Sequence, residues 1–137
     1  MRGAINGQWV GTGLVPGEQV GLAGSNAVRG FNERAAATDG GYVVNLEAYT
    51  PELQGLLSLP GNLRGVVFYD FANGWNNEAI APTLTKAAIS SWGVGLRYSY
   101  DKNTSFRVDL AQVLENGPVA ATDNRSVRGH FSLSVGF

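Results

Sequence analysis

The strongest constraint on the fold is the alternation of residue types in the last eight residues, His130 to Phe137. Because successive side chains of a β-strand point to opposite faces, one face of this segment carries Phe131, Leu133, Val135 and Phe137. A final strand that is apolar outside, polar inside and closed by Phe is typical of bacterial outer-membrane barrels. The segment therefore predicts an all-β chain, with these four residues as a C-terminal assembly signal.

The same alternation recurs along the chain. It predicts about six antiparallel strands, at 2–10, 41–50, 63–73, 89–100, 104–114 and 129–137. In the third, fourth and fifth segments the charged residues fall on one face and large apolar residues on the other, as expected for a water-filled barrel. Charged residues make up only 15% of the chain, which suits a surface that faces lipid.

The number of predicted strands is too small for a barrel, because about eight are needed before side chains can fill the interior. The amino-terminus has no apolar segment typical of a signal peptide. We therefore expect this chain to be the C-terminal part of a longer outer-membrane protein, with a long extracellular loop at 11–40.

That loop contains the sequence Val28-Arg29-Gly30-Phe31, a cation next to a glycine and an aromatic residue. If the loop folds back into the lumen, Arg29 needs an acceptor on the inward face of a strand. Asp70 is the first candidate and Glu47 the second. Two alternatives stay open at this point: Arg29 is solvated, or Asp70 pairs with a strand arginine, Arg97 or Arg107.

The chain contains four segments in this order: Val28-Arg29-Gly30-Phe31, the strand Gly41 to Glu47, Phe68-Tyr69-Asp70 and the strand ending in Phe137. This ordered set resembles the outer-membrane transporters of two-partner secretion. These are the haemolysin secretion/activation proteins. The resemblance implies a transmembrane barrel of about sixteen antiparallel strands, of which residues 1–137 form the C-terminal part. The periplasmic POTRA domains and the earlier strands would be absent from this chain.

The resemblance also implies roles for residues of the loop and the barrel wall. The loop tip, formed by Val28, Arg29, Gly30 and Phe31, would enter the lumen, where Arg29 contacts the Asp70 of a Phe-x-Asp motif that begins at Phe68. The protein would be a pore in the bacterial outer membrane that secretes and activates a large unfolded exoprotein, such as a haemolysin or an adhesin. Its partners would be that exoprotein, outer-membrane lipid and, through the C-terminal strand, the barrel-assembly machinery.

Two other functions stay open. One is insertion of other barrels into the outer membrane by a member of the same superfamily. The other is a soluble β-sandwich with a structural or adhesive role, in which the apolar faces of two sheets would pack together.

Enzymatic and nucleic-acid functions are disfavoured. The chain has no cysteine, its single histidine is His130, and it lacks the Gly-x-Ser-x-Gly sequence of a hydrolase nucleophile. The net charge of −1 offers no basic surface for nucleic acid. We expect no catalytic residue, no metal site and no cofactor.

Overall fold

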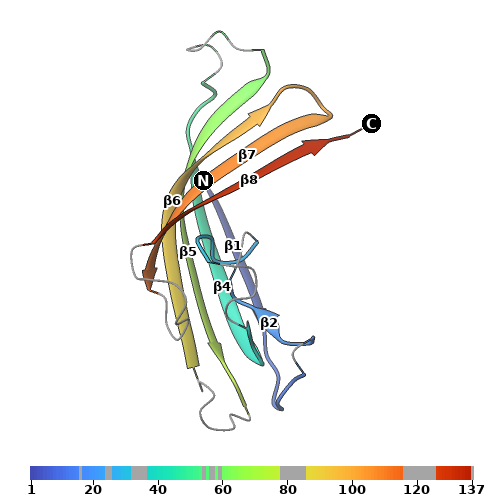
Figure 1. Cartoon of the computed structure of the whole chain (residues 1–137), viewed down its shortest axis with the longest axis vertical. Coiled ribbons are helices and arrows are strands. Elements are labelled where there is room, and N and C mark those ends of the chain that lie inside the picture. The colour runs from blue at the N-terminus through green and yellow to red at the C-terminus, as the bar shows by residue number, and fades with distance from the viewer. Residues whose placement is uncertain are drawn as a thin grey trace.

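The protein folds around one curved antiparallel sheet, seen in a computed structural model that describes residues 1–15, 17–23, 26–31, 37–53, 55, 58, 60–77, 86–115 and 126–136. Within these residues the strand order is β1-β4-β5-β6-β7-β8, so each of these strands pairs with the next one along the chain (Figure 1). The strands are β1 (Arg2–Gln8), β4 (Gly40–Tyr49), β5 (Asn62–Trp75), β6 (Lys86–Ser99), β7 (Thr104–Glu115) and β8 (Val127–Val135). The all-β, antiparallel class expected from the sequence is confirmed.

The strand bounds differ from the expected ones mainly at the ends. β5 and β6 are longer than expected and reach Trp75 and Lys86, because small residues such as Gly74 and Ala87 weaken the alternation there. The sequence of 79–88 fits either a strand extension or a loop; its last three residues belong to β6, whereas 78–85 lies outside the described residues. The segment from Leu53 to Leu59, whose sequence is compatible with a short helical turn, also lies mostly outside them, as does Phe137.

The long loop at 11–40 contains two short strands that the sequence did not predict. These are β2 (Val20–Gly21) and β3 (Ala37–Thr38), which pair antiparallel. Two-residue strands are too short to produce a visible alternation, so pattern reading had no signal to detect. Together they fold the loop into a hairpin that returns to the sheet.

One face of the sheet is apolar and exposed. Val67, Val94 and Leu110 are cross-strand neighbours on β5, β6 and β7, and each is about half exposed. Other large apolar residues on this face are also exposed: Tyr42, Leu46, Tyr69, Trp92, Leu96, Phe106, Phe131, Leu133 and Val135. A continuous apolar surface of this kind indicates contact with a membrane or with another protein, whereas scattered single apolar residues do not.

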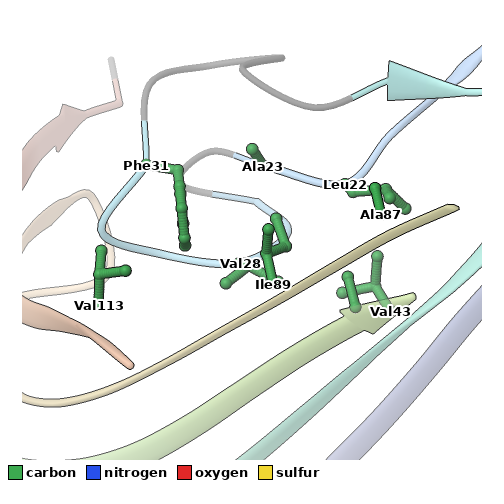
Figure 2. Close-up of a cluster of buried hydrophobic side chains, with 9 residues drawn as sticks. Leu22, Ala23, Val28, Phe31, Val43, Ala87, Ile89 and Val113 are labelled. Atoms are coloured by element: carbon green, nitrogen blue, oxygen red, sulfur yellow. The ribbon is translucent and has the colours of Figure 1, made fainter. Parts of the chain in front are cut away.

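The core lies on the opposite face, between the sheet and the loop (Figure 2). The loop contributes Leu22, Ala23, Val28 and Phe31, and the strands contribute Val43, Ala72, Ala87, Ile89 and Val113. Among the described residues, the side chains that a sandwich would bury, such as Val67 and Leu133, are exposed. In the described part of the chain, no helix is long and apolar enough to cross a membrane.

Gly93 on β6 lies where β5 and β7 approach closely on the core side. It pairs with Phe68 on one side and Ala111 on the other. A Cβ atom at this position would lie 2.5 Å from the ring of Phe68 and 2.9 Å from the Cα of Ala111. The ring of Phe68 can occupy its place only because residue 93 has no side chain.

We therefore expect Gly93→Ala to displace Phe68 and to destabilise the protein by about 1–3 kcal/mol, the usual cost of overpacking. Thermal unfolding measures this effect. Gly129→Ala is the matched control, because its added Cβ would meet only ordinary contacts, the nearest at 3.4 Å from Leu110. Equal unfolding temperatures for the two variants would contradict the close approach at Gly93.

Candidate functional site

The loop tip is held against the sheet by apolar contacts on both sides of Arg29. Val28 and Phe31 are fully buried in the core cluster, and the backbone N–H of Val28 donates to the carbonyl of Leu22 at 3.1 Å. Gly30 has a φ of +96°, which other residue types rarely adopt, and this turns the chain directly after Arg29. The local conformation therefore points Arg29 at the sheet.

Arg29 makes a two-pronged contact with Asp70 of β5. Its Nε donates to Oδ2 at 2.6 Å and its Nη2 donates to Oδ1 at 2.8 Å. The backbone N–H of Arg29 also donates to Oδ2, at 3.2 Å. The side chains are 3% and 0% exposed, so this ion pair is shielded from water.

The carboxylate of Asp70 accepts a fourth hydrogen bond, from Asn45 of β4. Asn45 Nδ2 donates to Asp70 Oδ1 at 2.8 Å and also donates to the carbonyl of Ala27 in the loop, again at 2.8 Å. With two donors on each oxygen, the hydrogen-bonding capacity of Asp70 is filled. Asn45 thus ties the loop backbone to the same carboxylate that binds Arg29.

Glu47 of β4 provides a second carboxylate for Arg29. Arg29 Nη1 donates to Glu47 Oε1 at 2.8 Å, and the hydroxyl of Tyr49 donates to Glu47 Oε2 at 2.5 Å. Both acceptors named from the sequence, Asp70 and Glu47, are therefore engaged by one guanidinium. Tyr49 was not expected at the site, although its spacing of two residues from Glu47 places it on the same face of the strand.

Phe68 forms the floor of the site. The guanidinium carbon of Arg29 lies 3.6 Å from the centroid of the Phe68 ring, which is a cation–π arrangement. Phe68 is itself 2% exposed, so the flat side of the cation rests on an apolar surface while its edge meets carboxylates. A lysine cannot reproduce both contacts, because its ammonium group is not planar.

The electrostatics keep Arg29 charged. Burial on its own disfavours the cation, but hydrogen bonds and charge from Asp70, followed by those from Glu47, outweigh burial and raise the pKa of Arg29 above its ordinary value. Arg29 is consequently a permanent cation at physiological pH.

His130 of β8, on the same inner face of the sheet as Asp70, also contacts the tip. Its Nε2 accepts a hydrogen bond of 3.2 Å from the backbone N–H of Gly30. The sequence predicts no catalytic role for His130, and its place on the inward face of β8 is the signal that puts it near the loop. The tip therefore touches β4, β5 and β8.

The strand arginines do not pair with Asp70. Arg97 and Arg107 both contact Asp109 of β7 instead, each at 2.7 Å. Asp109 is 1% exposed and lies on the same face of the sheet as Asp70. Asp109 therefore engages these two arginines, and Asp70 is bound by Arg29.

A cavity of about 500 Å³ opens beside the tip. Its lining runs from β1 at one end of the sheet to β8 at the other: Arg2, Asn6, Asn26, Arg29, Glu47, Tyr49, Arg97, Arg107 and Ser132 are among its residues. Strands at opposite ends of the strand order can share one cavity only if the sheet curls around it. Among the described residues, no group of three or more His, Cys, Asp or Glu side chains could hold a metal ion.

The remaining residues singled out from the sequence lie elsewhere. Phe131, Leu133 and Val135 are on the exposed apolar face of β8, away from Arg29, and Phe137 lies outside the described residues.

The geometry predicts strong energetic coupling between Arg29 and Asp70. Removing one partner of a buried pair costs about 3–5 kcal/mol, because the other charge stays buried and loses its partner. We expect Arg29→Ala and Asp70→Ala each to lower the free energy of unfolding substantially. The double variant should be destabilised by less than the sum, with a coupling of at least about 1 kcal/mol. Urea denaturation of the four proteins measures the cycle, and additive effects would contradict a direct interaction.

The family model described as haemolysin secretion/activation protein ShlB/FhaC/HecB matches residues 2–98, a span that includes the loop tip, Glu47, Phe68 and Asp70. No curated protein and no solved structure matches the chain. Since the match covers more than half of the residues, the chain belongs to the haemolysin secretion/activation protein ShlB/FhaC/HecB family.

Proposed function

We propose that this protein is a pore of the bacterial outer membrane that secretes and activates a large unfolded exoprotein by two-partner secretion. One observation carries the proposal: a loop arginine is buried against Asp70 on the polar face of a sheet whose other face is apolar and exposed. Membership of the haemolysin secretion/activation family supports the same role.

The exposed apolar face supports a position in lipid. Unpaired backbone groups are costly in a bilayer, so a sheet can span it only when closed into a barrel. In the described residues β1 and β8 form the two ends of the strand order, and each needs a further neighbour. We propose that these strands form the C-terminal sector of a barrel of about sixteen strands, closed by earlier strands of the same protein and preceded by POTRA domains.

The curled polar face supports a route for a polypeptide. It combines a cavity lined by polar and charged side chains with the loop tip. Transport through such a cavity is a physical passage with no covalent step. We propose that the docked tip, held by Arg29, Asp70 and Glu47, maintains the transport-competent barrel while the exoprotein passes. The family match favours secretion and activation over insertion of other barrels.

The last strand supports a further partner. Phe131, Leu133 and Val135 are 80%, 63% and 49% exposed on the proposed lipid face. We propose that this strand is the part of the chain that the barrel-assembly machinery binds during insertion.

The membrane assignment can be tested with a charge on each face of the sheet. We expect Val94→Arg to reduce the amount of protein inserted in the outer membrane, since a lipid-facing arginine costs about 2–4 kcal/mol near the bilayer midplane. Asn6→Arg is the matched control, because Asn6 is exposed and lines the inner cavity. The measurement is the quantity of protein in washed outer-membrane fractions. Equal insertion of the two variants would argue against a lipid-facing surface.

The transport role can be tested at the tip. In the full protein, Arg29→Ala or Asp70→Ala should abolish or sharply reduce secretion of the cognate exoprotein, because the tip loses its main polar contact, while the barrel stays inserted. The measurement is exoprotein in the culture medium relative to protein in the outer membrane.

Arg64→Ala is the control for this experiment. It breaks the exposed ion pair with Glu52, and such pairs contribute little to stability. Undiminished secretion by both tip variants would overturn the role assigned to Arg29 and Asp70.

A further inference from the structure

We propose that Asp39 is a positioning residue that fixes the register of the loop hairpin and thereby delivers Arg29 to Asp70. The inference rests on the proposed function only where secretion is the readout. Asp39 directly follows β3 and directly precedes β4, and it is 3% exposed.

The carboxylate of Asp39 gathers three segments at one end of the sheet. Its Oδ1 accepts hydrogen bonds of 3.0 Å from the backbone N–H of Leu14 and from Gln19 Nε2, both on the outgoing leg of the loop. Its Oδ2 accepts a bond of 2.9 Å from the backbone N–H of Asn77, just after β5. One side chain thus joins both legs of the loop to the sheet.

The backbone of Asp39 adds to this junction. Its N–H donates to Asn76 Oδ1 at 3.0 Å, and its carbonyl accepts from Gln8 Nε2 at 3.2 Å. The side chain of Asn77 donates back to the carbonyls of Val10 and Thr12, at 2.6 and 3.1 Å. Hydrogen bonds of Asp39, Asn76 and Asn77 therefore join the start of the loop, its return and the segment after β5.

The position of Gln19 explains why this junction controls the register. The β2–β3 ladder contains the pairs Val20 with Thr38 and Gly21 with Ala37, so Gln19 and Asp39 occupy the next rung. A ladder of two pairs is too short to fix its own register, and a slip of one residue would turn every side chain to the other face. The contact between Gln19 and Asp39 extends the ladder with a specific side-chain pair.

A register slip at this end would be transmitted to the tip. Leu22 and Ala23 follow β2 directly, and the backbone N–H of Val28 donates a hydrogen bond to the carbonyl of Leu22. The burial of these three residues and the placement of Arg29 therefore depend on where the hairpin starts. Asp39 acts on the tip through the hairpin, by way of its bonds to Leu14, Gln19 and Asn77. Its expected signature is a displaced tip in a barrel that is still folded.

Cysteine labelling of the tip tests this directly. The 137 residues contain no cysteine, so Val28→Cys in a cysteine-free background of the full protein reports on the fully buried tip. A membrane-impermeant maleimide should label Val28→Cys slowly. Adding Asp39→Ala should accelerate labelling about tenfold or more, since several donors lose their acceptor, with secretion reduced in parallel. Asp39→Asn, which keeps one acceptor oxygen, should have a smaller effect.

Two controls make the result decisive. Glu18→Ala removes a nearby exposed carboxylate but keeps the backbone carbonyl of residue 18, which accepts a hydrogen bond from Gln8. This variant should leave labelling of Val28→Cys unchanged. A cysteine at the exposed Asn26 should label rapidly in every background. Slow labelling of Val28→Cys in both Asp39 variants would overturn the proposal. Accelerated labelling with undiminished secretion would support the positioning role and count against the proposed transport function.

Discussion

The buried contact between Arg29 and Asp70 is the interaction on which the arrangement of the loop depends. Removing two charges from water costs several kcal/mol for each ion, and only good geometry recovers that cost. Here Asp70 accepts four hydrogen bonds, and the guanidinium meets two carboxylates at its edge and an aromatic ring at its face. The surrounding apolar cluster supplies burial, whereas the ion pair gives the tip a single orientation.

That contact exists because strand alternation divides the sheet into two different environments. Tyr69 and Asp70 are neighbours in the sequence, yet Tyr69 is 41% exposed and Asp70 is fully buried. The same parity places Val94 outside and Gly93 against Phe68. A residue's surroundings in this protein are therefore set by odd or even position along its strand, and the chemistry of the inner face cannot be separated from the apolar character of the outer one.

The sequence predicted the features that depend on this alternation and missed those that depend on tertiary detail. Strand positions and the inward placement of Asp70 and Glu47 followed from period-two patterns. The bridging role of Asn45 and the bond between Gly30 and His130 depend on where the loop docks, which no local pattern encodes. Asp39 precedes two glycines and resembles an ordinary turn residue, so its burial was invisible before the hairpin was placed.

The two polar anchors of the loop differ in kind, and this difference bears on how the loop can act. At the tip, a cation is matched to carboxylates on strands that belong to the sheet, so undocking would uncover two negative charges within the cavity. At the base, the carboxylate of Asp39 accepts hydrogen bonds from neutral donors, two on the outgoing leg of the loop and one just after β5. Leu14, Gln19 and Asn77, which bind the Asp39 carboxylate, are different residues from those that bind Arg29, namely Asp70, Glu47 and Phe68. We therefore expect docking of the tip to respond to changes at either anchor while the strand ladder of the sheet stays intact.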